Sequence, residues 1–298
     1  MEPLKPSVSK TSQWVYSSPI IRIGAFRCPA HHPAWKTENC IDSGPIVVFP
    51  RVPVRIKHAD KPPVIADSNC VMLYNACQPY TRELLDPRGD ACEFFSISEP
   101  LLLEVLATFA PHTADRPDQP FEAASGPSDS RIYLAQRRLF EYVAADEQPD
   151  RLRVDELALH VIEETLAAVY RRNNTRRTAR RRDTNCCHRD AAEAAKVVLT
   201  ADYRRRLSLN EIADRVHLSP FHLCRVFRRI TGRSLHQYVT QLRLRRSLEM
   251  LADRPTDLTR VALDLGFSSH AHFTSTFSSA FGISPAAFRE HSGKTLLN

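Results

Sequence analysis

The sequence predicts an α+β protein with a strand-rich first third, a helical middle and a C-terminal part made only of helices. Short β-branched or aromatic runs, separated by prolines, occupy the first hundred or so residues. Apolar residues then recur at helical spacing from Glu99 onward. From Ala191 the pattern is helical throughout and nearly repeats itself, which indicates two copies of one supersecondary unit.

The front of the chain is expected to form a small all-β barrel or sandwich. Five segments have strand composition: Ile20–Phe26, Ile46–Phe49, Val52–Ile56, Val71–Tyr74 and Cys92–Ile97. Prolines interrupt them at positions 45, 50, 53, 62, 63 and 79. A helix is predicted over Glu99–Phe109, and the polar stretch Pro111–Ser130 is predicted to be a loop.

Two amphipathic helices, Ser130–Ala145 and Arg153–Arg171, are expected to connect the front of the chain to its end. They fit a dimerisation surface or a buttress on the β domain equally well. The following stretch, Arg171–Asp183, contains seven arginines, and it can be a linker, a solvated helix end or a non-specific phosphate contact. The predicted domains are therefore 1–125, a helical connector over 126–183, and 184–298.

Composition limits the function. No apolar run approaches the ~20 residues of a membrane helix, and the N-terminus lacks signal-peptide features, so a cytoplasmic location without membrane contact is expected. The eight cysteines are expected to be reduced. No P-loop, dinucleotide fingerprint, nucleophile elbow or zinc-protease helix is present. We therefore expect no enzymatic activity and no cofactor.

Two cysteine–histidine groups are candidate sites. Cys28, His31, His32 and Cys40 do not have a standard zinc spacing, and no metal is expected there. Cys186, Cys187 and His188 stand beside the arginine-rich stretch, and the cysteines are the candidate reactive groups. They are two ordinary thiols or a redox-sensitive spot, because nearby cations lower thiol pKa values.

Charge is distributed unevenly along the chain. The whole chain carries a net charge of +7, but residues 1–170 carry −6, residues 171–183 carry +6 and residues 184–298 carry +7. This distribution fits either ordinary solvated surface charge or a back end that alone contacts a polyanion.

The repeat in the last part of the chain predicts two helix-turn-helix units. The segment from Ile212 to Ser219 matches the segment from Val261 to Ser268 at an offset of 49, and later positions match at an offset of 50. The expected N-caps are Ser208, with Glu211 completing a capping box, and Ser219 in the first copy, and Asp257 and Ser268 or Ser269 in the second. Gly232 and Gly282 are expected to end the second helices. The units span about 208–232 and 257–282.

The second helix of the first copy has two distinct faces. Leu223, Val226 and Phe227 are expected in the core. The opposite face carries Phe221, His222, Cys224, Arg225, Arg228 and Arg229. Arg225 is the expected base reader, because arginine pairs bidentately with guanine. Arg228 and Arg229 are better placed to contact phosphates. The long helix Leu235–Leu251 between the copies is expected to expose Arg243, Arg245 and Arg246.

The repeat closely resembles the AraC/XylS family of transcription regulators over about Ala191–Glu290. The segment from Val261 to Ser269 carries the resemblance most strongly, followed by Phe273, Phe277, the run from Phe281 to Pro285, and Phe288 with Arg289. The resemblance implies a cupin-type β-barrel that senses a ligand or dimerises, and two DNA-reading subdomains. It also implies activation through RNA polymerase, with promoter DNA, an unknown small-molecule effector and a second copy of the chain as partners.

The second copy departs from the family pattern. Many members carry basic residues between the two phenylalanines and just after them, whereas here the stretch from Phe273 to Ser279 has none. His270, Ala271, Thr274 and Ser275 are the residues it can offer to base edges. The first copy is therefore expected to dominate affinity.

The sequence offers two alternatives to a ligand-modulated regulator. One is a constitutive regulator whose β domain only dimerises or contacts RNA polymerase. The other is a DNA-modifying enzyme that uses the repeat for targeting, which is disfavoured because the front half has no nucleophile motif.

Overall fold

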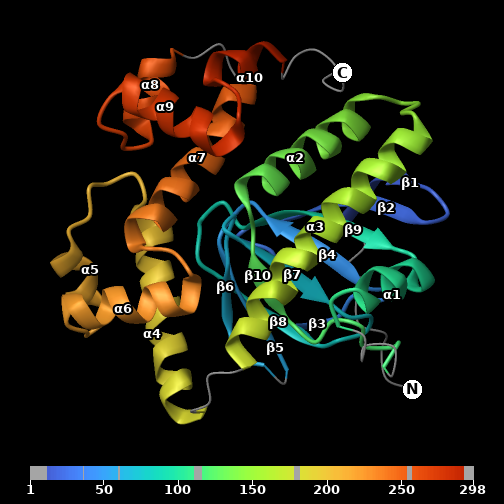
Figure 1. Cartoon of the computed structure of the whole chain (residues 1–298), viewed down its shortest axis with the longest axis horizontal. Helices are drawn as coiled ribbons and strands as arrows, with labels where there is room; N and C mark the ends of the chain where they lie inside the picture. The colour runs from blue at the N-terminus through green and yellow to red at the C-terminus, as the bar shows by residue number, and fades with distance from the viewer. Residues whose placement is uncertain are drawn as a thin grey trace. The chain divides into compact units, whose positions relative to one another are not determined.

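The computed structural model describes residues 12–35, 37–59, 61–110, 116–177, 182–253 and 257–291. The chain divides into two compact units (Figure 1). Unit 1 consists of Met1–Ser128 and Ala135–Arg176, and unit 2 consists of Asp129–Leu134 and Arg177–Asn298. Most of the helices expected to form the connector are thus grouped with the sheets in unit 1.

Unit 1 contains two antiparallel sheets. The larger has the order β1-β2-β9-β4-β7-β10 and the smaller has the order β3-β8-β5-β6. The strands are β1 Ser12–Ser17, β2 Ile21–Cys28, β3 Glu38–Asn39, β4 Ile46–Pro50, β5 Val54–His58, β6 Val64–Ala66, β7 Cys70–Tyr74, β8 Tyr80–Leu84, β9 Asp90–Ile97 and β10 Ser125–Pro127. One hydrophobic cluster draws residues from both sheets, such as Val48 and Met72 from the larger and Ile56 from the smaller, so this core lies between them.

The α+β class and the strand-rich front are confirmed, and all five predicted strands are present. The expected barrel is not closed, because the described strands form two separate hydrogen-bonded sheets. The predicted loop at Pro111–Ser130 was partly wrong. Within it, β10 pairs with β7, with Ser125 opposite Met72 and Pro127 opposite Cys70. A Ser-Gly-Pro strand has no β propensity of its own, and tertiary pairing forms it.

Three helices accompany the sheets of unit 1. They are α1 Glu99–Ala107, α2 Ser130–Ala145 and α3 Arg151–Arg177. The α3 helix crosses in front of the larger sheet (Figure 1). A Cβ on Gly126 would lie 2.4 Å from the side chain of Val169, so α3 approaches β10 at a distance that only glycine allows. The α3 helix also extends beyond its predicted end at Arg171 to Arg177, and side chains 172–183 of the arginine-rich stretch lie outside the described residues.

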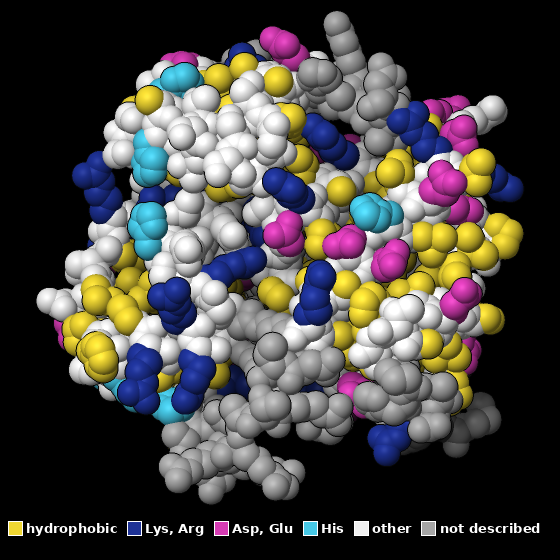
Figure 2. Space-filling model, in the orientation of Figure 1, with side chains coloured by type: hydrophobic (Ala, Val, Ile, Leu, Met, Phe, Trp, Pro, Cys, Tyr) yellow, Lys and Arg dark blue, Asp and Glu magenta, His cyan; other side chains and the backbone are white. Residues whose placement is uncertain are grey.

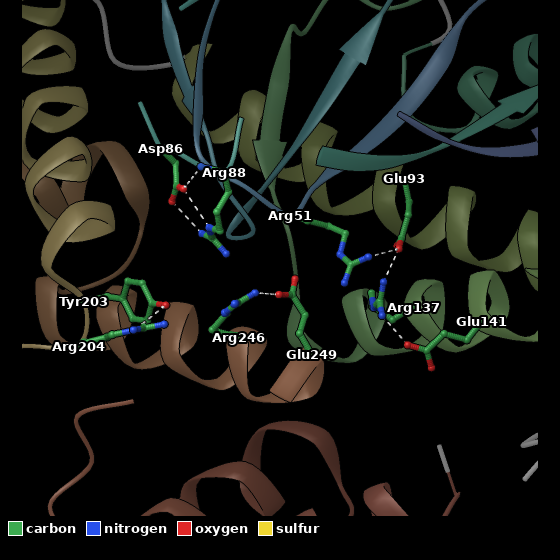
Figure 3. Close-up of polar contacts among 10 residues, drawn as sticks. All are labelled: Arg51, Asp86, Arg88, Glu93, Arg137, Glu141, Tyr203, Arg204, Arg246 and Glu249. Atoms are coloured by element: carbon green, nitrogen blue, oxygen red, sulfur yellow. Dashed lines mark hydrogen bonds and ion pairs between the residues drawn. The ribbon is translucent and has the colours of Figure 1, made fainter. Parts of the chain in front are cut away.

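Polar contacts join α2 to the larger sheet of unit 1 (Figure 3). Glu93 on β9 is 1% exposed and accepts hydrogen bonds from Gln136 and Arg137 on α2. Arg51 donates to the same carboxylate at 3.3 Å, and Arg137 also pairs with Glu141. A buried carboxylate is tolerated only when it is paired in this way, so the cluster sets the position of α2 on the sheet.

The described residues of unit 2 form helices and the turns between them, with two hydrophobic clusters. Its main helices are α4 Arg182–Asp202, α5 Leu209–Arg215, α6 Pro220–Thr231, α7 Leu235–Asp253, α8 Leu258–Asp264, α9 His270–Phe281 and α10 Pro285–His291. The first helical core joins α4, α5, α6 and the start of α7, with Leu223 and Phe227 among its buried residues. The second helical core joins the rest of α7 with α8, α9 and α10, around Phe273 and Phe277.

Among the described residues, the model contains no helix that is both long enough and apolar enough to span a bilayer.

Candidate nucleic-acid interface

The start of α5 is capped largely as predicted. The Ser208 hydroxyl accepts from the Glu211 amide at 3.1 Å. The Glu211 carboxylate pairs with Arg205 at 3.1 Å, so only the serine half of the expected capping box is seen. Arg205 competes for this carboxylate because the loop before α5 places it beside the first turn.

The turn between α5 and α6 also follows the prediction. His217 has the positive φ of 55° that the tight turn requires, and the Leu218 amide donates to Ala213 at 3.0 Å. Ser219 then caps α6 by accepting from the His222 amide at 3.3 Å. Gly232 ends the helix in the left-handed conformation, with φ of 76°.

The two faces of α6 divide as the sequence predicted. Leu223, Val226 and Phe227 are at most 2% exposed. On the opposite side Cys224, Arg225, Arg228 and Arg229 are exposed, and His222 is half-buried. Phe221 is 78% exposed at the second position of the helix. This face thus combines an exposed aromatic side chain with three arginines, residue types that are enriched at contact surfaces.

Positive charge on α6 is uncompensated. Among the described residues, no carboxylate forms an ion pair with Arg225, Arg228 or Arg229. Three guanidinium groups without a carboxylate partner on one short helix create a strong local field for anions. This arrangement suits contact with phosphates and base edges.

A residue outside the predicted set joins this face. His188 on α4 contacts the Arg229 guanidinium, and its ring lies 5.4 Å from that of His222. Burial, followed by Arg229, His222 and Arg225, lowers the pKa of His188 below its usual value of 6.5. The arginine-rich stretch just before it was the only signal in the sequence, and it could not show that α4 packs against α6.

The redox hypothesis for the neighbouring cysteines receives no support. Cys186 is exposed, and Asp190 is the largest cause that raises its pKa above 9.0. The Asp190 carboxylate lies 3.8 Å from the sulfur. The sequence argument considered only the preceding arginines, whereas the helix places the aspartate one turn away.

The second unit repeats the scaffold of the first. Asp257 caps α8 by accepting from the Thr259 amide at 3.0 Å. Of the two candidate caps for α9, Ser269 accepts from the His272 amide at 3.1 Å. Gly266 in the turn and Gly282 after α9 have φ of 81° and 75°. The end of α9 at Gly282 was predicted from the repeat.

The α9 helix contains no Lys or Arg, so its exposed face carries neither. His270, Ala271 and Ser275 are exposed, Thr274 is half-buried, and the Thr274 hydroxyl lies 3.3 Å from the His270 ring. Figure 2 shows Lys and Arg side chains gathered over α6, whereas the surface over α9 is mostly uncharged with a few histidines. The two units thus present different chemistry on equivalent helices.

The expectation that α7 exposes three arginines was wrong. Arg245 is 1% exposed, and its guanidinium lies 4.7 Å from the centre of the Tyr133 ring. Arg246 pairs with Glu249 one turn on (Figure 3). Arg243 donates to backbone carbonyls. Helical periodicity cannot distinguish an arginine that faces water from one that faces polar groups of another segment.

Within the described part of the chain, no three His, Cys, Asp or Glu side chains form a group that could hold a metal ion.

Comparisons with known proteins agree with this geometry. A family model described as "Helix-turn-helix domain" matches residues 212–291. The chain is similar to the Probable transcription factor PqrA of Proteus vulgaris, with 35% identity over 28% of this chain and 70% of that protein. It is also similar to the Msm operon regulatory protein of Streptococcus mutans, with 29% identity over 36% of this chain and 39% of that protein.

A solved transcriptional regulator of Chromobacterium violaceum, described as having an AraC-type DNA-binding domain, is 30% identical. The match covers 35% of this chain and 94% of that one, with a TM-score of 0.34. The chain covers only 30% to 40% of the length of the first curated relatives that it matches. The family model covers most of the repeat, and the chain belongs to the AraC/XylS family of helix-turn-helix transcription regulators.

Proposed function

We propose that the chain is a sequence-specific DNA-binding transcription regulator whose helices α6 and α9 enter two adjacent major grooves of promoter DNA. The observation that carries this proposal is the exposed face of α6, where Phe221, Arg225, Arg228 and Arg229 point away from the core without carboxylate partners. Arg225 reads a base, the other two arginines hold phosphates, and α6 supplies most of the affinity. The uncharged face of α9 contributes hydroxyl and imidazole contacts from His270, Thr274 and Ser275.

A salt titration of the full chain tests this proposal. Binding to DNA from upstream of its own gene is compared with binding to scrambled DNA of the same composition. A preference of ~10³-fold or more at ~0.15 M salt is expected for a sequence reader. Equal and steeply salt-sensitive binding to both would mean that the basic surface only holds phosphates. The Arg260→Ala variant is a matched control, because Arg260 is an exposed arginine on α8 rather than on α6 or α9.

An effector bound by unit 1 is the second part of the proposal. The cluster between the sheets contains Tyr74 and Tyr80, whose rings lie 4.9 Å apart, with His58 packed against Tyr74. Next to them Arg82 pairs with Asp90 at 3.1 Å, both almost fully buried. Burial raises the pKa of Asp90 although Arg82 opposes it. Buried ionisable groups with perturbed pKa values cluster at functional sites, which supports this interior as the place where a small molecule acts.

The effector proposal is tested by a thermal-shift screen of small polar and aromatic molecules against the full chain, followed by DNA-binding assays with each hit. A hit that changes DNA affinity, and that loses its effect in Arg82→Met, supports a ligand-modulated regulator. The alternative holds if no molecule changes DNA affinity: unit 1 then only dimerises or contacts RNA polymerase. Dimerisation and transcriptional activation are proposed from family membership, and light scattering and a reporter assay test them.

A further inference from the structure

The loop after α4, residues 203–206, lies at the junction of the two helix-turn-helix units. Tyr203 packs against both the first and the second helical core. In the sequence this loop directly precedes the first unit. Its contacts therefore reach the second unit as well as the first.

Arg243 on α7 ties this loop to the turn of the second unit. Its Nε donates to the Tyr203 carbonyl at 2.6 Å, and its Nη2 donates to the Arg205 carbonyl at 2.9 Å. Its Nη1 donates to the Gly266 carbonyl, in the turn between α8 and α9, at 2.8 Å. One planar guanidinium thus bonds two carbonyls on one side of the junction and one on the other.

The backbone of the second turn presses directly on the loop. A Cβ on Gly266 would lie 2.3 Å from the Arg204 carbonyl oxygen, which no side chain allows. Gly266 also has a φ of 81°. The matching position in the first unit is His217, which adopts a φ of 55° with a side chain. Only the second turn needs glycine for space as well as for its backbone conformation.

The fork geometry of arginine constrains this junction. Three donors in a fixed plane constrain the positions of three carbonyls, whereas the single ammonium group of lysine constrains them much less. The Arg243 side chain is half-buried, and burial, with Arg206 as a second cause, lowers its pKa. The free-energy cost of removing this charge from water is offset by the hydrogen bonds that all three guanidinium nitrogens donate.

We propose that Arg243 fixes the angle between the two helix-turn-helix units and so sets the spacing between the two DNA segments that the chain accepts. Arg243 is a positioning residue in this proposal and touches no base. The proposal rests on the proposed function, since it assumes that α6 and α9 bind one DNA molecule. Two modules joined rigidly gain affinity only from sites that match their geometry.

The test uses the full chain and a DNA site that it selects from a random-sequence pool. Footprinting first identifies the two DNA segments that the bound chain protects from cleavage. One base pair is then inserted or deleted between these segments, which shifts one relative to the other by about 3.4 Å and about 35°. The wild-type chain should lose affinity by at least ~10-fold on either change, because only one module can then bind in register. The Arg243→Lys variant, which keeps the charge, should lose less than ~3-fold on the same change. Its thermal unfolding is recorded to show that it is folded.

Arg246→Ala is the matched control. Arg246 lies on the same helix and is paired with Glu249, so its removal should leave the spacing penalty as in the wild type. Gly266→Ala disturbs the same junction from the turn of the second unit, because its Cβ would collide with the Arg204 carbonyl. It should reduce the loss of affinity on changed spacing as Arg243→Lys does. The inference is overturned if the wild type binds all three spacings equally, or if folded Arg243→Lys keeps the full penalty. Failure of the proposed function gives a different result, since the chain would then select no site from the pool.

Discussion

The two helix-turn-helix units share one scaffold and differ in their exposed chemistry. Leu223 and Phe227 of the first unit correspond to Phe273 and Phe277 of the second, and all four are fully buried. The N-caps of α6 and α9 and the glycines that end these helices also correspond. On the exposed faces, however, three arginines in α6, at positions 225, 228 and 229, correspond to three serines in α9, at 275, 278 and 279. Core and caps thus determine where a recognition helix lies, and they leave its surface free to diverge.

The largest expected effect comes from the base-reading position. Arg225→Ala should reduce discrimination at one base pair by ~1–3 kcal/mol, the usual contribution of a bidentate arginine–guanine contact. Ser275→Ala, at the equivalent position of α9, should change discrimination much less. Affinities for the selected site and for each single-base variant measure both. If the two substitutions cost the same, the asymmetry between the units does not extend to base reading.

A smaller effect is expected on salt dependence. Arg228→Ala should weaken binding to every sequence and reduce the slope of log K against log salt by about 1. Ser279→Arg adds a guanidinium to an exposed position of α9 and should steepen the slope by about 1. Filter binding or anisotropy at several salt concentrations gives the slopes. An unchanged slope in Ser279→Arg would show that α9 does not approach a phosphate at this position.

The smallest effect concerns pH. Burial and the nearby Arg229, His222 and Arg225 lower the pKa of His188 in the free protein; on its own helix Arg189, Asp190 and the thiols of Cys186 and Cys187 are also close. DNA phosphates would offset those arginine charges and raise the pKa again, so the complex holds more protons than the free protein. Affinity should therefore increase as pH falls from 7 towards 6, by less than ~10-fold because one proton is linked.

The His188→Gln variant should lose this dependence, whereas His236→Gln, which removes an exposed histidine on α7, should keep it. Equal pH profiles for wild type and His188→Gln would remove His188 from the DNA-binding surface of the first unit.

Local signals in the sequence predicted the helical part of the fold well. Caps such as Ser219 and Asp257 and the end of α6 at Gly232 depend on residues within one turn of each other, so spacing alone identifies them. Exposure of the α6 side chains followed from helical periodicity for the same reason.

Contacts between distant segments were not predictable in this way. Arg243 was placed on an exposed face because its partners lie 23 to 40 residues away in the sequence. The strand β10 forms only because β7 pairs with it, and His188 reaches α6 only because α4 packs there. In each case the local sequence fits several environments, and tertiary packing decides among them.

The shared side chain of Tyr203 has a consequence for folding. Because it packs against both helical cores, neither helix-turn-helix unit has a complete interior of its own. The two repeats of unit 2 should therefore open together as one cooperative block rather than fray separately, and amide protons of α6 and α9 should exchange with similar protection. The two units should therefore share one free energy of unfolding, even though their exposed faces differ.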